Sequence, residues 1–198
     1  IWQRAFGKEF GNLAQGNDLT GTPGTNTIYV LSHDEIRNIP TDRTVTYVCV
    51  VVDYRPQKGD PNRVRITVGG NLIDYPGELT TRTADLIVTS KILWNSTLST
   101  PDARYMCADV KNFYLCTPMD RPEYMKMRAD LFPEEFMQAY NLHDKVYKGF
   151  IWMKIIRTMY GLPQAGILAN KLLKKRLARH GYHEQPHTPG LWKHDTRP

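Results

Sequence analysis

The sequence predicts an α+β fold in which a mixed sheet packs on helices and a long basic β-hairpin stands out. Residues 44–54 are mostly β-branched or aromatic, which is typical of a strand. Residues 63–68 alternate polar and apolar side chains, as a strand with one exposed face does. Residues 165–177 carry apolar side chains at helical spacing. The 198 residues suffice for one or two domains with a hydrophobic core.

The first thirty-five residues predict a helix, a loop, a strand and a second helix. Apolar side chains recur at helical spacing over residues 2–13, and a glycine-rich loop without a phosphate-loop motif follows at residues 15–25. Residues 28–31 predict a short strand. Ser32 and Glu35 then have the spacing of a capping box, which predicts a helix start.

Residues 44–54 and 63–68 are predicted to pair as one β-hairpin, joined by a charged, turn-rich loop. The loop contains Lys58 near its tip. Because side chains alternate along a strand, Arg63 and Arg65 are expected on one face. The alternative is a surface hairpin with ordinary solvated arginines.

Helical spacing continues over residues 83–93, and a buried strand is predicted at residues 105–108, ending at Asp109. A carboxylate at the end of an apolar strand is costly to desolvate unless its charge is used. A metal ion would use it, and so would a turn that the carboxylate caps. Both interpretations are open on these residues alone.

The remaining elements follow in short order. We predict a turn at residues 118–122, a strand at 123–127, a helix at 133–140 and two short strands within 145–156. Residues 160–166 then form a loop that enters a long helix. The face of this helix opposite its apolar stripe carries Lys171, Lys174, Lys175 and Arg179.

The charge distribution favours a polyanionic partner. The formal net charge is +6, and residues 148–183 contain eight basic side chains and no acidic one. Such a stretch favours a phosphate-facing surface over a merely solvated face. We therefore expect the four basic residues of the long helix to contact nucleic acid.

The cysteines and the absence of a signal-peptide pattern bear on the cellular compartment of the protein. Cys49, Cys107 and Cys116 are expected to be buried free thiols, which suits a reducing compartment. The chain has no signal-peptide pattern and no run of eighteen apolar residues. We expect an intracellular protein, in a cytoplasmic particle or the nucleus, without a membrane partner. Because it lacks an initial methionine, we also expect a segment of a longer polypeptide.

Three stretches, in this order, resemble the reverse transcriptase of LTR retrotransposons, most closely the copia type. They are residues 63–70 (Arg-Val-Arg-Ile-Thr-Val-Gly-Gly), residues 108–115 (Ala-Asp-Val-Lys-Asn-Phe-Tyr-Leu) and residues 159–165 (Met-Tyr-Gly-Leu-Pro-Gln-Ala). The second is followed by Glu-Tyr-Met at residues 123–125. The third is the most specific, and the resemblance extends from about Trp2 to His194.

The resemblance implies the fingers and a partial palm of a right-hand polymerase. Residues 1–100 would be fingers, with an N-terminal extension and a β-hairpin at 44–68. Residues 101–127 would hold the palm strand and the first catalytic motif. Residues 128–165 would return to the fingers, and residues 166–198 would form a palm helix and a truncated end.

The implied reaction is transfer of a nucleotidyl group from a dNTP to a primer 3′-hydroxyl on an RNA or DNA template. Two Mg²⁺ ions, about 3.5–4 Å apart, stabilise the charge in such a displacement. Mg²⁺ prefers oxygen ligands. Asp109 matches the family's first metal ligand, and the carbonyl of Val110 is a further one.

The resemblance also implies nucleotide contacts. Tyr114 would be the steric gate that excludes a 2′-hydroxyl, or else a core aromatic. Gln164 would contact the sugar of the nucleotide, or else be a polar group at a helix start. Arg65, with Arg63 and Lys58 behind it, would neutralise the triphosphate. Copia-type spacing favours Arg65 and retroviral spacing favours Arg63.

One family motif is missing, since no two aspartates are adjacent in the sequence. We therefore expect weak Mg²⁺ binding and no polymerisation by this chain alone. We also expect an exposed palm edge strand that promotes self-association.

Three other functions compete with this interpretation. The first is a non-catalytic nucleic-acid-binding module derived from a retrotransposon. The second is a zinc module formed by His180, His183 and His187, although Gly181 and Pro186 interrupt any single helix that would carry them. The third is a viral RNA-replicase palm, and the run at residues 160–165 argues against it.

Overall fold

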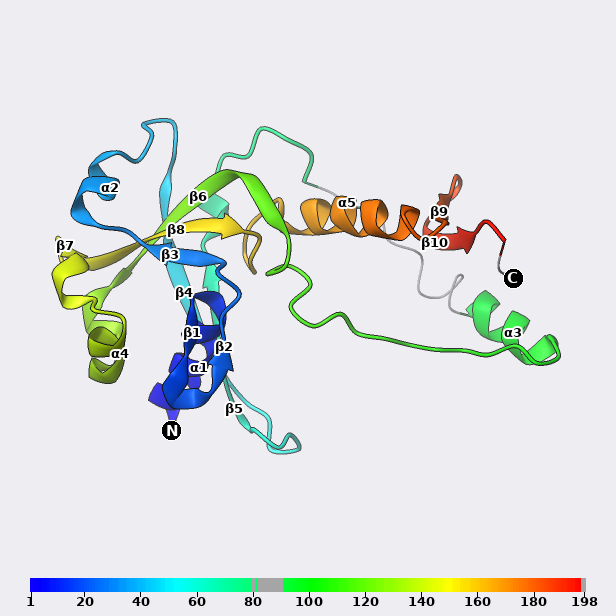
Figure 1. The fold of residues 1–198 in the computed structure, drawn as a ribbon, viewed down its shortest axis with the longest axis horizontal. Coiled ribbons are helices and arrows are strands. Elements are labelled where there is room, and N and C mark those ends of the chain that lie inside the picture. The colour runs from blue at the N-terminus through cyan, green and yellow to red at the C-terminus, as the bar shows by residue number, and fades with distance from the viewer. Residues whose placement is uncertain (80, 82–90, 197–198) are drawn as a thin grey trace.

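The computed structural model describes residues 1–79, 81 and 91–196. Its main body is a six-stranded, curled mixed sheet in the order β3-β8-β6-β4-β5, with β7 beside β8 (Figure 1). Helices pack on the sheet, so the predicted α+β class is confirmed. None of the helices in the described ranges is long and apolar enough to cross a membrane.

The element bounds complete the description. The helices are α1 (Trp2–Leu13), α2 (His33–Arg37), α3 (Lys91–Ser99), α4 (Glu134–Ala139) and α5 (Ala165–Ala178). The main sheet contains β3 (Ile28–Val30), β4 (Val45–Tyr54), β5 (Asn62–Val68), β6 (Pro118–Arg128), β7 (Val146–Tyr147) and β8 (Phe150–Arg157). Two small hairpins join β1 (Gly16–Asn17) to β2 (Thr22–Pro23) and β9 (Tyr182–Gln185) to β10 (Thr188–His194).

The hydrophobic core lies between one face of the sheet and the pair of helices α1 and α4 (Figure 1). Phe10 of α1 is 1% exposed, and its ring meets that of Phe132 edge-on at 5.2 Å. Met125 of β6 and Met153 of β8 are buried beneath them. Each such side chain contributes roughly 1.5–3 kcal/mol of burial free energy. The core therefore fixes α1 against the sheet, as its apolar spacing predicted.

The predicted hairpin is confirmed. Val51 pairs with Arg65 and Asp53 with Arg63, so the two arginines share one face of β5. Val64 and Ile66 point to the other face and are buried. β4 pairs with β6 only over residues 45–47, and beyond Tyr47 it pairs with β5 alone. The hairpin consequently projects from the main body as a two-stranded ribbon.

The capping box at the start of α2 is also confirmed. The backbone N–H of Ser32 donates to the carboxylate of Glu35 at 2.8 Å, and the N–H of Glu35 donates to the Ser32 hydroxyl. These bonds satisfy two donors that a helix start leaves unpaired. The helix then ends before Pro40.

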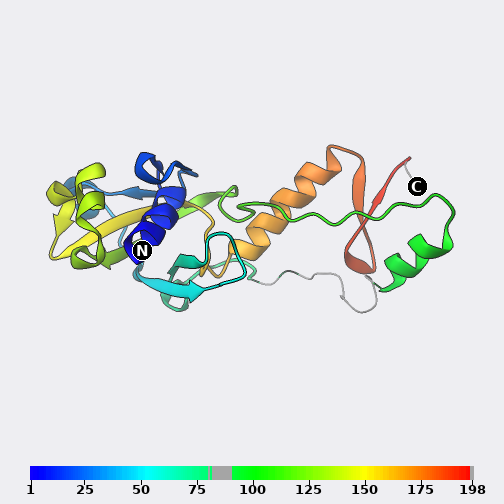
Figure 2. The same ribbon diagram turned by 90° about the horizontal axis from the view of Figure 1, so that it is seen from below.

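The strand predicted at residues 105–108 is wrong. These residues are extended but unpaired, and Tyr105 and Met106 are 53% and 85% exposed. The interior strands of the sheet already have a neighbour on each side, so an apolar run of four residues finds no free interior position. The run instead extends with α3 away from the sheet (Figures 1 and 2). Most of the helical pattern predicted at residues 83–93 lies outside the described residues.

Two smaller predictions are corrected as well. The turn predicted at residues 118–122 is the start of β6, where a register shift against β8 between Pro118 and Glu123 accommodates the prolines. The cysteines are free but not buried, since Cys107 and Cys116 are exposed and Cys49 is partly exposed. Cys107 belongs to the unpaired segment and Cys116 lies in the turn at residues 111–116, so both thiols are outside the sheet.

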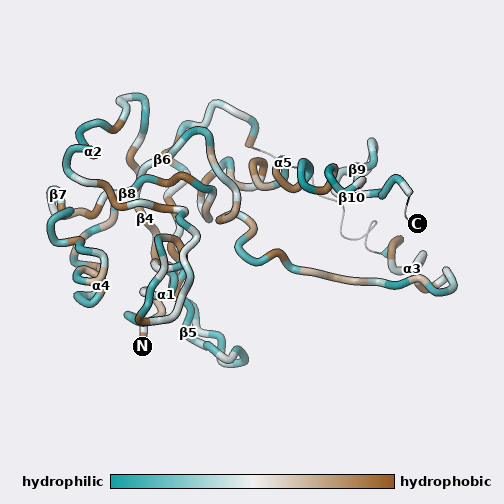
Figure 3. Tube along the Cα trace, viewed as in Figure 1, coloured by the Kyte–Doolittle hydropathy of each residue, from teal (hydrophilic) through white to brown (hydrophobic). Residues whose placement is uncertain are grey.

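Figure 3 shows where hydrophobic residues gather along the chain. They concentrate in the strands of the main sheet, and a second concentration lies in α3 and the extended segment after it. Trp94 and Tyr105 bring these two parts into contact, with ring centroids 5.9 Å apart. The exposed apolar side chains of the described residues therefore lie mainly on this projecting arm and on the hairpin ribbon.

Candidate functional site

Arg65, Tyr160 and Tyr114 come together from three distant stretches of the sequence. The guanidinium carbon of Arg65 lies 5.3 Å from the centre of the Tyr160 ring. The Tyr160 ring meets the Tyr114 ring edge-on, with centroids 5.4 Å apart. The arrangement connects the hairpin, the turn after Asp109 and the loop that precedes α5. We call these three residues the aromatic–arginine cluster.

Backbone contacts hold the base of the hairpin against this loop. The N–H of Val68 donates to the carbonyl of Tyr160 at 3.0 Å. Gly161 has a φ of 97°, and a Cβ there would lie 2.1 Å from the Val68 carbonyl. A Cβ on Gly70 would lie 1.9 Å from the Gly161 carbonyl. Only glycine allows this approach, so Gly70 and Gly161 set the position of the cluster.

Tyr114 lies in a compact turn that packs on the core. Asn112 adopts a φ of 55°, and its carbonyl accepts the N–H of Cys116 at 3.0 Å. The Thr158 hydroxyl donates to the carbonyl of Tyr114. Tyr114 packs against the core and is only partly buried. The turn fixes this ring beside Tyr160.

Asp109 and Val110 lie in the exposed, extended segment before this turn. Neither residue belongs to a strand, and Val110 is 58% exposed. Within residues 1–79, 81 and 91–196, no group of three or more His, Cys, Asp or Glu side chains could hold a metal ion. The structure thus presents one exposed carboxylate here, without the other acidic ligands of a two-metal site.

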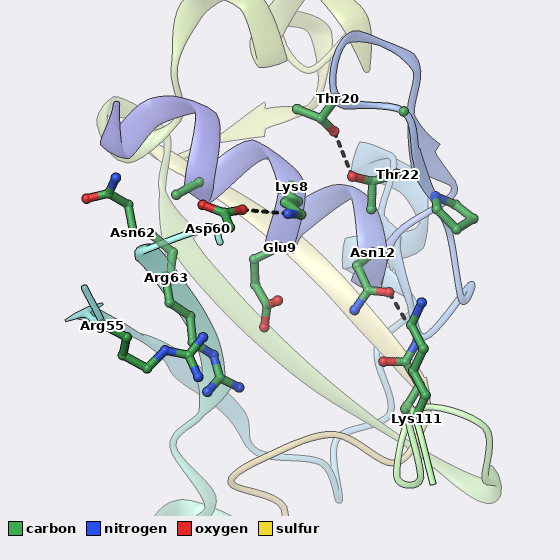
Figure 4. A pocket seen from close by; sticks show the side chains of 15 residues that line it. Lys8, Glu9, Asn12, Thr20, Thr22, Arg55, Asp60, Asn62, Arg63 and Lys111 are labelled. Atoms are coloured by element: carbon green, nitrogen blue, oxygen red, sulfur yellow. Dashed lines mark hydrogen bonds and ion pairs between the residues drawn. The ribbon is translucent and has the colours of Figure 1, made fainter. Parts of the chain in front are cut away.

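A cavity of about 410 Å³ lies between α1, the hairpin and the turn after Asp109 (Figure 4). Arg55 and Arg63 line it from the hairpin, and Lys111 lines it from the turn. Lys8 also lines it, but its ammonium pairs with Asp60 at 2.6 Å. The cavity therefore brings positive charge from the hairpin next to the motif that contains Asp109.

Glu9 of α1 provides a negative charge at the inner side of this cavity. Burial raises the pKa of the Glu9 carboxyl, while the N–H of Ile66, Arg63 and Arg65 act in the opposite direction. The pKa of Arg63 is lowered by its burial and by the neighbouring charges of Arg65 and Arg55. One acid thus faces several cations that repel one another, which favours a bound anion.

Two hairpin arginines also have unused hydrogen-bonding capacity. Among the described residues, the buried Nε atoms of Arg55 and Arg65 have no hydrogen-bond partner, although that of Arg55 lies 3.6 Å from the Asp53 carboxylate in an ion pair. Lys58 lies at the exposed tip of the hairpin, further from the loop that holds Tyr160. Unsatisfied guanidinium donors are the groups that bind phosphate oxygens in fork geometry. Of the predicted triphosphate contacts, Arg65 has such an unpaired donor, and Arg63 lines the cavity together with Arg55.

Gln164 is buried rather than exposed to a ligand. It is 1% exposed, and its Nε2 donates to Glu123 at 3.2 Å, while its Oε1 has no hydrogen-bond partner among the described residues. Glu123 is 2% exposed, and burial raises its pKa against the influence of Arg121 and Arg43. The sequence indicated the inward direction of Glu123, because side chains alternate between the two faces of a strand and Glu123 shares a face with Met125.

The basic residues of α5 divide into two groups. Lys171, Lys175 and Arg179 are exposed, whereas Lys174 forms an ion pair with Glu184 of β9. The Glu184 carboxylate also accepts the N–H of Gly190. Three of the four cations predicted to contact nucleic acid therefore remain exposed. Of the histidines considered for zinc, His183 pairs with Asp195.

Comparison of the chain with protein-family models, curated proteins and solved structures found no match.

Proposed function

We propose that this chain is the fingers and partial palm of an RNA-directed DNA polymerase, a reverse transcriptase of the copia-type LTR retrotransposon class. The observation that carries the proposal is the aromatic–arginine cluster. It joins one residue from each of the three stretches that resemble that family. The subdivision at residues 100, 127 and 165 into fingers, palm, fingers and palm belongs to the same proposal.

In this proposal, the incoming dNTP lies against the cluster and the cavity. Arg65 and Arg63 bind the triphosphate through guanidinium donors, and Lys58 contributes charge from the hairpin tip. Tyr114 excludes a ribonucleotide by contact with the 2′ position. The supporting features are the unpaired Nε of Arg65 and the mutual repulsion of the hairpin arginines.

Asp109 and the Val110 carbonyl are the proposed Mg²⁺ ligands. Their donor types fit, because Mg²⁺ binds carboxylate and carbonyl oxygens together with substrate phosphates and water. When bound, the metal would stabilise charge on the phosphate oxygens. One carboxylate is fewer than a two-metal site uses, so we expect weak Mg²⁺ binding and no primer extension by the 198 residues alone.

Nucleotide discrimination tests the proposal without requiring polymerisation. A template–primer complex of the protein would be cross-linked to a photoreactive dATP, with unlabelled dATP or ATP as competitor. We expect dATP to compete about tenfold better, equivalent to about 1.4 kcal/mol. Tyr114→Ala should remove that preference and leave dATP binding intact. Equal competition by both nucleotides in the wild-type protein would contradict the proposal.

A non-catalytic nucleic-acid-binding module is the second candidate function. The observation that favours it is the exposure of Asp109 on an unpaired segment together with the free cations of α5. It predicts salt-sensitive binding of nucleic acid without specific cross-linking of a dNTP. The cross-linking experiment therefore separates the two functions.

Self-association is proposed through a free strand edge. The edge expected in the palm is not formed by residues 105–108, which are not a strand. Within the described sheet, β4 has a free edge beyond Tyr47, where Val51 and Val52 are 49% and 55% exposed. An exposed apolar edge of this kind promotes pairing between chains. Concentration-dependent sedimentation would test whether copies associate.

A further inference from the structure

The outer face of the main sheet carries lysines set between aromatic side chains. Lys126 of β6 pairs in register with Trp152 of β8 on one side and with Tyr47 of β4 on the other. Their strand neighbours, such as Met125 and Met153, are buried in the core, so this row points to the opposite face. One aromatic–lysine–aromatic row thus crosses three adjacent strands.

A second row repeats the pattern two residues along the strands. Lys154 of β8 pairs with Tyr29 of β3 and with Tyr124 of β6. Phe150, on the other side of Trp152 along β8, has the same outward parity. We define the aromatic–lysine face by the side chains of Tyr29, Tyr47, Lys126, Phe150, Trp152 and Lys154.

The rings and the charges of this face are in direct contact. The ammonium of Lys126 lies 4.9 Å from the centre of the Trp152 ring and 5.0 Å from that of Phe150. Two such cation–π contacts hold a positive charge at a defined place among rings. A freely solvated lysine would not be fixed in this way.

Part of the face is covered and part is open. Ile36 of α2 packs on Tyr124, which is only 8% exposed. Tyr29 and Tyr47 are 41% and 44% exposed, and Trp152 is partly exposed. The two rows therefore keep accessible rings at both of their margins.

Acidic groups near the face are already engaged. The register positions of the two rows carry no Asp or Glu, although Asp53, further out along β4, has the same parity as Tyr47. Glu35 approaches Lys154, but its carboxylate accepts the N–H and hydroxyl of Ser32. Asp130 pairs with Arg128. Lys126 and Lys154 are therefore the charged side chains at the register positions of the two rows, with the Glu35 carboxylate near Lys154.

We propose that the aromatic–lysine face binds single-stranded nucleic acid, with phosphates on Lys126 and Lys154 and bases stacked on the exposed rings. The two rows are about 6.6 Å apart along the strands. A stacked strand rises only about 3.4 Å per nucleotide, so a strand that follows the rows is extended and its bases are free to stack on side chains. The inference does not depend on the nucleotide site proposed above, because it uses different residues.

The test is fluorescence anisotropy of a labelled oligothymidylate of about 12 nucleotides, a length within the range for one binding fold. The double variant Lys126→Gln with Lys154→Gln should bind at least tenfold more weakly and reduce the slope of log K against log salt by about 1.4. Lys193→Gln, which removes one exposed charge from β10, is the matched control and should bind as the wild type does.

Tyr29→Ala tests the stacking separately from charge. It should weaken oligothymidylate binding about fivefold or more, the low end for loss of one stacked base. Binding of an abasic oligonucleotide of the same length should not change. Thermal melting of each variant checks that the fold is retained. Equal loss for both oligonucleotides, or wild-type affinity in the double lysine variant, would overturn the proposal.

An anionic membrane is the other kind of partner that aromatic and lysine side chains bind. Phosphatidylserine vesicles therefore form a further arm of the experiment. If the protein sediments with vesicles through Lys126 and Lys154, and oligothymidylate does not displace it, the nucleic-acid proposal is wrong. Displacement by oligothymidylate, or no vesicle binding, supports it.

Discussion

The guanidinium carbon of Arg65 lies 5.3 Å from the centre of the Tyr160 ring, although the two residues are 95 positions apart in the sequence. A contact of this kind is worth about 0.5–2 kcal/mol, depending on how well it is desolvated. It holds the arginine over the loop before any ligand is present. The Arg65 side chain is therefore already ordered in the free protein. Binding of a charged ligand then costs less conformational entropy.

Arg65→Lys should weaken triphosphate binding by about five- to tenfold although the charge is retained, because an ammonium lacks the planar fork and stacks less well. Tyr160→Leu should weaken it to a similar degree, and the double variant should lose little more. Isothermal titration with inorganic triphosphate measures all three variants. Arg37→Lys on α2 is the matched control. Strictly additive losses would show that the ring contact does not orient Arg65.

Gly161→Ala should destabilise the fold by roughly 1–3 kcal/mol, because the new Cβ meets the Val68 carbonyl and the residue keeps a positive φ. Urea unfolding followed by circular dichroism measures the change. Gly59→Ala at the hairpin tip is the control, since a Cβ there has nothing within 4 Å. A Gly161→Ala variant as stable as Gly59→Ala would mean that the base of the hairpin is not tightly held.

Stability should fall as the pH rises above about 4.5, because burial raises the pKa of Glu123 above that ordinary value. A carboxyl with a raised folded pKa stabilises the fold below the unfolded pKa and loses this contribution as the pH passes the folded pKa. Glu9 contributes in the same direction. Glu123→Gln should flatten the profile of melting temperature above pH 4.5.

Glu35→Gln provides the opposite control. Its pKa is lowered by hydrogen bonds from Ser32, so its stabilisation is lost as the pH falls through the folded pKa. The Glu35→Gln profile should differ from that of the wild type mainly on the acid side. If both variants changed the same side of the profile, the assignment of Glu123 as the buried acid would be wrong.

Replacement of Lys171, Lys175 and Arg179 by Gln should reduce the salt slope of single-strand binding by about 2, since each phosphate contact contributes about 0.7. Lys174→Gln should change the slope much less, because Lys174 is paired with Glu184. Filter binding over a series of salt concentrations measures both. A larger effect of Lys174→Gln than of any other single change would place the contact surface on the β9 side of α5.

The elements that local chemistry determines were predictable from the sequence. The shared face of Arg63 and Arg65 follows from alternation along the strand, and the start of α2 follows from Ser32 and Glu35. The segment at residues 105–108 was not predictable in the same way. Its side chains are suited to a strand, but a strand also needs a partner edge, and pairing depends on parts of the chain far away in sequence.

For the site residues too, the sequence indicated some positions, whereas the contacts between them required the fold. Motif spacing pointed to Arg65 and Tyr114, but their connection through Tyr160 required the fold, because the three lie on separate loops and strands. Gln164 was expected to contact a nucleotide, whereas its amide donates to Glu123 in the interior. Alternation along the strand places the Glu123 side chain inward, but it does not identify Gln164 as its hydrogen-bond partner.

The joint between Val68 and Tyr160 consists of main-chain atoms and two glycines. Movement of the hairpin tip cannot loosen this joint by changing a side-chain rotamer, so bending must occur further out along the ribbon. Amide hydrogen exchange should then follow a gradient, with slow exchange at Val68 and fast exchange around Lys58. A ligand that closes the ribbon would slow exchange at the tip and leave the protection of its base unchanged.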